Sequence, residues 1–368
     1  MFTVGFVPAL MFGTTVAQAP ASVATLREAA GAGLLIGCAA SSRDVKEPKL
    51  SAMIARQFNC LTADNEMMPS MMVDSAGNFT FERGDRVAQF AQEHGMPFFG
   101  HMLLWHHLTH EWFFKDRDGT PLSRDRALAN LRYYIEHVAA HYRGKVKAWD
   151  VVNEALSDKD GEYLRDTPAL RAIGEDYILK AFEFAHEADP DAELYYNDYN
   201  IEEPAKRAKA IRLIRSLQGK GLRIDAIGIQ GHWHLNWPKP AVISDAIREF
   251  SKEGVKVMVT ELDVDVLPRT TNGADLVSVE EGPNPYPNGL PDEMQQKLAK
   301  RYAEIFEAIL KPAGVTMITF WGPDDDHSWL NDFPVKHRTN YPLLFDRNAE
   351  PKPALAAVVD VLERMTHD

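Results

Sequence analysis

From residue 33 onward the chain alternates between short apolar segments and longer amphipathic ones. The short segments are rich in Val, Ile, Leu and aromatic residues and are bounded by turn-forming residues, which predicts buried strands. They cover residues 34–39, 58–62, 97–103, 146–152, 193–197, 226–230, 257–261 and 317–321. The intervening segments repeat apolar residues at helical spacing over 49–58, 84–94, 124–142, 169–188, 204–217, 241–252, 292–310 and 353–364.

Eight strands alternating with eight helices predict an α/β fold in the form of a parallel (β/α)8 TIM barrel. An open doubly wound sheet is the alternative, but no Gly-rich phosphate loop follows the first strand. The 368 residues, 45% of them hydrophobic, can bury a large core, and no linker divides the pattern. We therefore expect a single domain over residues 20–368, with its functional residues at the carboxyl ends of the strands.

The first twenty residues carry no charged side chain. An apolar run from Val4 to Val16 precedes Ala17-Gln18-Ala19, which is typical of a secretory cleavage site. We therefore expect residues 1–19 to be a signal peptide and the protein to be secreted or periplasmic. The alternative is a packed or disordered N-terminal arm, since no Lys or Arg precedes the apolar run. The run is too short and interrupted to form a membrane span.

The charge balance narrows the range of partners. Lys and Arg number 40 against 53 Asp and Glu, a net charge of −13, which disfavours a nucleic-acid backbone or an anionic membrane and favours a neutral ligand. The only cysteines, Cys38 and Cys60, fall in the first two predicted strands. We expect two buried free thiols, because strand geometry rarely suits a disulfide, and their spacing offers no metal site.

Two glutamates end predicted strands. Glu154 lies in the segment 149–156, Trp-Asp-Val-Val-Asn-Glu-Ala-Leu, which ends an apolar run beginning near Lys145, and Glu261 closes the apolar run from Val255. Strict alternation cannot aim both Asn153 and Glu154 into one site, so we infer a bulge or a strand end there. A lone Glu at a strand end would be an ordinary surface residue. Two at the same end of a barrel supply the carboxyl pair that glycosidic hydrolysis requires.

Other polar and aromatic residues gather at the same predicted strand ends. They are Asp64, Asn65, Glu66, His101, Trp105, His106, His107, Asn197, Asp198, Tyr199, Asn200, Gln230, His232, His234, Trp321 and Trp329. Their joint clustering favours a binding site, because the loops at this end of a barrel carry its chemistry. The long irregular segment 267–291 is expected to form one wall of a cleft, with a surface insertion as the alternative.

Several motifs in order give a resemblance to a known family. Residues 149–154 look like the acid/base motif of the family 10 glycoside hydrolases, best known as endo-β-1,4-xylanases, and Val-Thr-Glu-Leu-Asp at 259–263 looks like their nucleophile motif. Further similar segments are 100–101, 104–106, 197–200, 230–233, 320–322 and 342–346. The resemblance runs from about residue 33 to the end of the chain.

The resemblance implies a retaining mechanism. Glu261 would attack the anomeric carbon while Glu154 protonates the leaving oxygen, with the two carboxyls about 5–5.5 Å apart. Glu154 must then hold its proton near neutral pH and Glu261 must not. His232 would hydrogen-bond Glu261, with Asp263 orienting the imidazole, and Asn153 would hold the 2-hydroxyl of the sugar at the cleavage point.

The remaining site residues that the resemblance implies contact the sugar chain. They are Asp64, Asn65, His101, Trp105, Tyr199, Gln230, Trp321 and Trp329. The first four and the last two would bind or stack on glycon sugars, whereas Tyr199 and Gln230 would line the centre and the leaving-group side. The expected partner is xylan or a xylo-oligosaccharide, bound by a monomer without a cofactor or a metal.

The chain departs from the family pattern on the glycon side. Residues 64–68 read Asp-Asn-Glu-Met-Met where the family has Glu-Asn-Glu-Met-Lys, and residues 106–108 read His-His-Leu where it has His-Ser-Gln. Pro323 replaces a usual Val. Because Met68 and Leu108 cannot form these polar contacts, we hypothesise weaker binding of plain xylose at the distal glycon subsite. The alternative is that His107 or His110 replaces the lost contacts.

Two other functions compete with glycoside hydrolysis. His232 and His234 form an H-x-H pair on one strand face, which a metal-dependent barrel hydrolase would need. A catalytically silent carbohydrate-binding barrel is the second alternative, because altered subsites could mark a binding protein. The presence of both Glu154 and Glu261 favours the enzyme over each of them.

Overall fold

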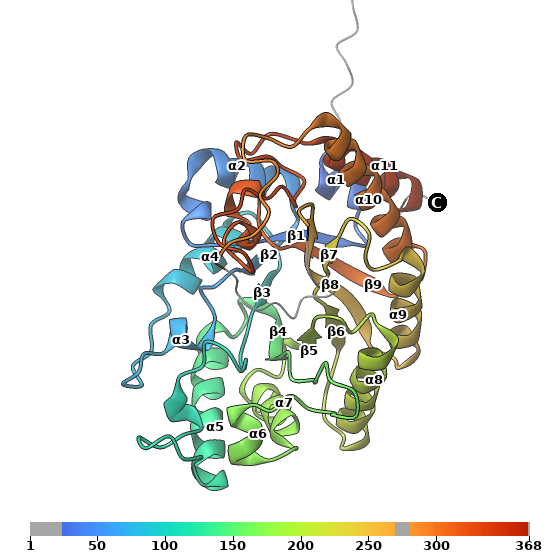
Figure 1. Ribbon diagram of the computed structural model, residues 1–368. Helices are drawn as coiled ribbons and strands as arrows, with labels where there is room; N and C mark the ends of the chain where they lie inside the picture. Colours follow the sequence, from blue (N-terminus) through green and yellow to red (C-terminus); the bar gives the residue numbers. More distant parts are fainter. Residues whose placement is uncertain (1–23, 269–279, 367–368) are drawn as a thin grey trace, which may run out of the picture.

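Parallel strands form a closed ring at the centre of the molecule, as the computed structural model shows for residues 24–268 and 280–366 (Figure 1). The strands of the ring are β1 (Leu35–Ala40), β2 (Cys60–Ala63), β3 (Phe98–Gly100), β4 (Val146–Asn153), β5 (Glu193–Asp198), β6 (Ala226–Ile229), β8 (Lys256–Asp265) and β9 (Val315–Phe320). Each pairs with its neighbours in order, and the pairing of β9 with β1 and of β6 with β8 closes the sheet. The expected (β/α)8 barrel is confirmed. The expected signal peptide, residues 1–19, lies outside the described ranges.

Helices surround the ring (Figure 1). The principal ones are α2 (Pro48–Gln57), α4 (Glu82–Glu93), α5 (Arg124–Tyr142), α7 (Tyr177–Ala188), α8 (Pro204–Gly219), α9 (Pro240–Lys252), α10 (Asp292–Leu310) and α11 (Pro353–Thr366). Several start with a proline, whose fixed φ suits the first turn and whose missing N–H costs nothing there. These helices agree closely with the predicted segments.

The prediction of one continuous helix over residues 169–188 was wrong. The segment 169–188 is divided into α6 (Pro168–Ile173) and α7. Gly174 separates them with φ 105°, a conformation that ends a helix and that glycine adopts readily. Two short α-helices, α1 (Leu26–Ala30) and α3 (Pro69–Met72), were not predicted. The short strand β7 (His232–His234), which pairs with the outer part of β8, was also missed.

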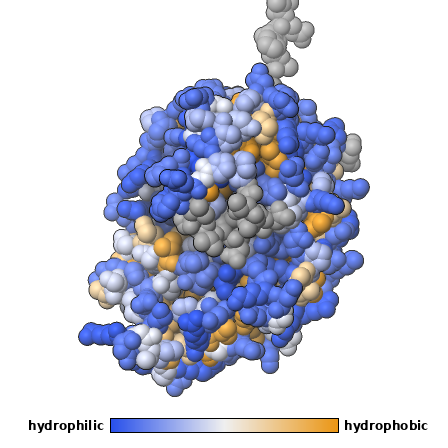
Figure 2. Space-filling model, viewed as in Figure 1, coloured by the Kyte–Doolittle hydropathy of each residue, from blue (hydrophilic) through white to orange (hydrophobic). Residues whose placement is uncertain are grey.

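The inside of the ring is filled by side chains rather than open. Its packed layer consists of Cys60, Phe99, Ala148, Tyr195, Ala226, Met258 and Met317. Cys38 and Cys60 are both buried free thiols, as expected, and burial raises the pKa of Cys60 to about 12. On the face in Figure 2, hydrophilic side chains predominate and apolar ones form small groups, which agrees with a core gathered inside.

The close approach of β3 and β4 depends on a glycine. A Cβ atom on Gly100 would lie 2.3 Å from Cε3 of Trp149, which is fully buried. The indole therefore covers the end of β3 and brings β4, which leads into Glu154, against it.

The segment after β8 is only partly described. Of the expected cleft wall, 267–291, residues 269–279 lie outside the described residues. Its later part packs on the segment after β9: the Tyr341 hydroxyl donates to the Tyr286 carbonyl at 2.5 Å, and Lys336 pairs with Glu280 at 2.6 Å. None of the helices in the described ranges is long and apolar enough to cross a bilayer.

Candidate active site

The end of β4 turns sharply to present Glu154. The strand ends at Asn153, and Glu154 takes φ 58°, in the left-handed region. The pairing of β4 with β5 also shifts register between Asp150 and Val152. The inference of an irregular strand end, made to explain how Asn153 and Glu154 share one site, is confirmed. The Glu154 N–H donates to the carbonyl of Asn197 at 2.9 Å, which fixes the turn against β5.

Two donors hold the Glu154 carboxyl. The Trp105 indole N–H donates to Oε2 at 2.9 Å, and the Gln230 amide donates to Oε1 at 2.9 Å. Burial, followed by the nearby charge of Asp198, raises the pKa of Glu154 to about 7, although both hydrogen bonds lower it. This carboxyl therefore holds its proton in at least about half of the molecules up to neutral pH, as a general acid must.

Glu261 lies in β8 in a different environment. The Asn197 amide donates to its Oε1 at 2.6 Å, and Nε2 of His232 lies 3.0 Å from its Oε2. Burial raises the pKa of Glu261, but the His232 hydrogen bond and the charges of His101 and His232 outweigh burial, so the pKa falls below its ordinary value. Glu261 is therefore ionised where Glu154 still holds its proton.

His232 is held between two carboxylates. Its Nδ1 lies 2.9 Å from Oδ2 of Asp263, which also accepts the Trp329 indole N–H at 2.7 Å. Burial lowers the pKa of His232, but Asp263 and Glu261 raise it to about 10. The imidazole is thus a cation with both nitrogens donating. In the described part of the chain, no group of three or more His, Cys, Asp or Glu side chains is arranged to hold a metal ion.

Asn197 joins the two halves of the site, and residue-by-residue reading of the sequence did not assign it a role. Its amide donates to Asn153 Oδ1 at 3.1 Å as well as to Glu261, while its own oxygen accepts from the Thr260 hydroxyl at 2.6 Å. Gln230 donates to the same Asn153 oxygen at 3.1 Å. The only sequence signal for a role of Asn197 was its position in the segment 197–200, which resembles a family motif.

A cavity of about 510 Å³ contains both glutamates at the carboxyl end of the barrel. Its lining includes the predicted residues Asp64, Asn65, His101, Trp105, Asn153, Tyr199, Gln230, His232, Trp321 and Trp329. Asp263 lies behind His232 instead of in the lining. Sequence reasoning did not place Arg165 and Phe333 there, since each comes from a loop without a recognisable pattern.

The part of this cavity that Asp64, Asn65 and Met68 line combines polar and apolar walls. Asn65 donates to Asp64 at 2.7 Å, and burial, followed by the charges of Glu66 and Asp44, raises the pKa of Asp64 to about 7. Met68 is buried in the wall, whereas Leu108 is 52% exposed.

The two histidines considered as replacements for the lost polar contacts differ in position. His107 lines the cavity. His110 instead hydrogen-bonds the Val73 carbonyl at 2.9 Å through Nε2. His101, a predicted glycon contact, is oriented by Asp150 at 3.1 Å.

A partly buried and a buried carboxyl with opposite pKa shifts, at the carboxyl end of a (β/α)8 barrel, match the acid and nucleophile pair of a glycoside hydrolase. Residues 24–361 match the model of glycosyl hydrolase family 10, so the chain belongs to that family. The chain is 43% identical over 309 residues to a β-1,4-xylanase of Dictyoglomus thermophilum, covering 83% of each chain. It is 38% identical over 347 residues to endo-1,4-β-xylanase A of Xylanibacter ruminicola, covering 92% of this chain and 94% of that one.

Solved structures agree with this assignment. A family 10 endoxylanase from a sugarcane soil metagenome superposes with a TM-score of 0.86 at 38% identity, covering 91% of this chain and 99% of that one. A xylanase of Paenibacillus barcinonensis, complexed with a conduramine derivative, gives a TM-score of 0.84 at 36% identity, covering 92% of this chain and 99% of that one.

Proposed function

We propose that the protein is an endo-1,4-β-xylanase that cleaves internal bonds of xylan with retention of anomeric configuration. Its relatives in the family are named β-1,4-xylanase or endo-1,4-β-xylanase. The observation that carries the proposal is the contrast between the two carboxyls: the pKa of Glu154 is raised to about 7, whereas that of Glu261 is lowered. One site thus holds an acid and a nucleophile at the same pH.

In the first step, a Glu261 oxygen forms a bond to the anomeric carbon. The bond from that carbon to the leaving oxygen breaks, and Glu154 transfers its proton to this oxygen. In the second step, Glu154 removes a proton from water, the water oxygen attacks the anomeric carbon, and Glu261 is released. Two inversions give net retention.

The surrounding residues support these steps. The cation of His232 keeps Glu261 ionised, and Asp263 holds the imidazole in place. Asn153 receives amide protons from Asn197 and Gln230 on its oxygen. Its own amide group is thereby oriented toward Glu154, 3.5 Å away, where it would meet the 2-hydroxyl of the bound sugar.

The test is a product analysis. Wild type and Glu261→Ala would be incubated with linear xylan, glucuronoxylan and cellulose, with products separated by chromatography and the first-formed anomer identified by NMR. We expect β-anomeric xylo-oligosaccharides from wild type only. Release of α-anomers first, or no release from any xylan, would contradict the proposal.

We further propose that the glycon subsites of this protein bind plain xylose less tightly than subsites with the usual family residues, Lys and Gln, would bind it. Met68 and Leu108 occupy positions where the resemblance implies Lys and Gln, and both line the cavity. Neither side chain can donate a hydrogen bond to a sugar hydroxyl. Leu108 is also held at φ 47° while largely exposed, an unusual combination for an apolar side chain. Loss of such partners costs about 1–3 kcal/mol.

A further inference from the structure

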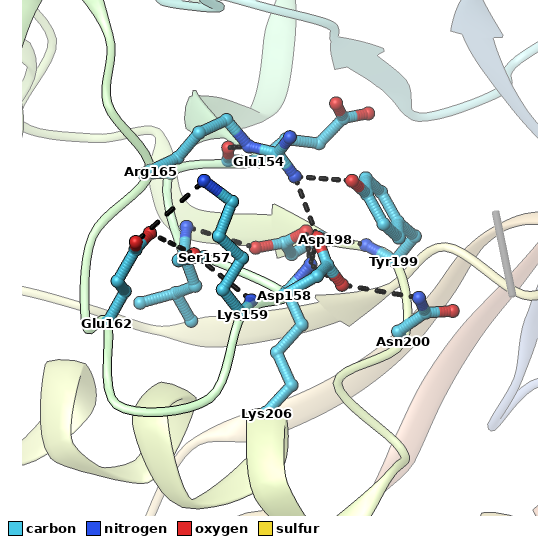
Figure 3. A network of polar contacts seen from close by, with 12 residues as sticks. Glu154, Ser157, Asp158, Lys159, Glu162, Arg165, Asp198, Tyr199, Asn200 and Lys206 are labelled. Atoms are coloured by element: carbon cyan, nitrogen blue, oxygen red, sulfur yellow. Dashed lines mark hydrogen bonds and ion pairs between the residues drawn. The ribbon is translucent and has the colours of Figure 1, made fainter. Parts of the chain in front are cut away.

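Arg165 lies beside the backbone of the acid/base candidate, Glu154 (Figure 3). Its Nε donates to the carbonyl of Glu154 at 3.1 Å, and its backbone N–H donates to the carbonyl of Ala155 at 2.8 Å. Its guanidinium also donates to the Tyr199 hydroxyl. One side chain therefore joins the backbone of Glu154 to a ring on the proposed leaving-group side of the cavity.

The Glu154 turn needs such support. A non-glycine residue at φ 58° occupies a conformation that L side chains rarely adopt and that persists only where neighbours enforce it. The next two N–H groups, of Ala155 and Leu156, donate to the Tyr196 hydroxyl at 2.9 and 3.0 Å. Arg165 holds the carbonyl of Glu154, so the turn is fixed on both sides.

Arg165 is itself held by a network of charged side chains (Figure 3). Asp158 accepts from its guanidinium at 2.9 Å, and Lys206 bridges Asp158 and Asp198 at 3.0 and 2.9 Å. The Lys206 ammonium lies 3.8 Å from the centroid of the Tyr199 ring. Asp198 and Lys206 are almost fully buried, so the inner end of the network is little screened by solvent, whereas its Arg165–Asp158 pair lies at the surface.

We propose that Arg165 is a positioning residue for the acid/base step, coupling the aim of Glu154 to the ring of Tyr199. The leaving-group sugar would contact the ring of Tyr199. The Tyr199 hydroxyl is bonded to Arg165, and Arg165 also holds the backbone of Glu154, the proton donor. This inference rests on the proposed function, because it assigns Arg165 a part in the first step of that reaction.

The leaving group provides the readout. A phenyl leaving group needs a proton from the enzyme to depart, whereas 2,4-dinitrophenolate leaves without one. The ratio kcat/KM covers the steps up to the first bond cleavage, so it reports on Glu154 as an acid and excludes its later role as a base. A misplaced Glu154 should therefore slow phenyl β-xylobioside and spare its dinitrophenyl analogue, whereas general loss of structure would slow both.

The experiment compares Arg165→Met with Lys209→Met. Lys209 is the matched control, because its ammonium donates to the carbonyls of Ser157 and Lys159, at 2.7 and 2.8 Å, and so holds the same loop away from Glu154. Since general acids contribute about 10²–10⁴-fold, we expect Arg165→Met to lower kcat/KM about 30-fold or more for the phenyl substrate and less than about threefold for the dinitrophenyl one.

Two further variants keep the test decisive if Arg165→Met does not fold. Arg165→Lys retains the charge but cannot reach both partners in one plane, and Asp158→Asn removes the anchor of the guanidinium. Both should show the same leaving-group dependence to a smaller degree. Equal losses on both substrates, or the same dependence in Lys209→Met, would overturn the proposal. Wild type inactive on both xylobiosides would instead contradict the proposed function.

Discussion

Nε2 of His232 lies 3.0 Å from Oε2 of Glu261, and this contact sets the charge of the nucleophile candidate. Replacement of His232 by Asn removes the cation that lowers the pKa of Glu261, so that pKa should rise. The acidic limb of the profile of kcat/KM against pH should then move upward by about one pH unit. Measurement of xylan hydrolysis between pH 3 and 9 checks this. An unmoved acidic limb would mean that another group controls ionisation of Glu261.

The alkaline limb of the profile of kcat/KM against pH depends on the ionisation of Glu154. Its pKa of about 7 predicts that activity falls as pH rises through that value, because the acid loses its proton. The Trp105 hydrogen bond lowers this pKa, so Trp105→Phe should move the limb to higher pH. Trp321→Phe is the control, since its ring lies against His101 and His232 and should leave the limb in place.

The glycon proposal predicts a gain of activity. The double variant Met68→Lys with Leu108→Gln should raise kcat/KM on short unbranched xylo-oligosaccharides about tenfold, as expected for about 1.4 kcal/mol of added binding energy. Met71→Lys adds the same charge on α3 outside the lining of the cavity and should change nothing. If the double variant gained no activity, the altered subsites would not limit binding.

The packing of β3 against β4 predicts a loss of stability. In Gly100→Ala, the new Cβ would overlap the Trp149 ring, and the free energy of unfolding should fall by about 1–3 kcal/mol. Gly33→Ala is the matched control, because a Cβ there meets nothing within 4 Å. Urea unfolding of both variants measures the difference. Equal stability of the two variants would show that the indole moves aside easily.

Periodicity predicted the barrel because each strand of a closed parallel ring is buried on both sides and reads as a short apolar run. The same topology explains why strand ends predicted the site: residues far apart in the sequence, such as Glu154 and Glu261, must meet at one end of the ring. The short strand β7 escaped prediction, because three residues containing two His carry no apolar pattern.

The contacts that tune the site could not be predicted in this way. The pairing of Arg165 with the carbonyl of Glu154 depends on the course of an irregular loop, and the central place of Asn197 depends on distances across the ring. The opposite pKa shifts of Glu154 and Glu261 arise from burial and from neighbours on other strands. Local sequence contains none of that information.

Glu154 directly follows β4 and Glu261 lies in β8, and these two strands are separated in the ring by β5 and β6. The distance between the two backbones is therefore set by hydrogen-bonded strands about 4.8 Å apart, while loop contacts such as that of Arg165 aim the Glu154 side chain. Carboxyl separation decides whether a glycosidase retains or inverts configuration. Loops such as those carrying Met68 and Leu108 can consequently change which polymer is cut. The anomeric configuration of the product, in contrast, depends on the strands of the barrel.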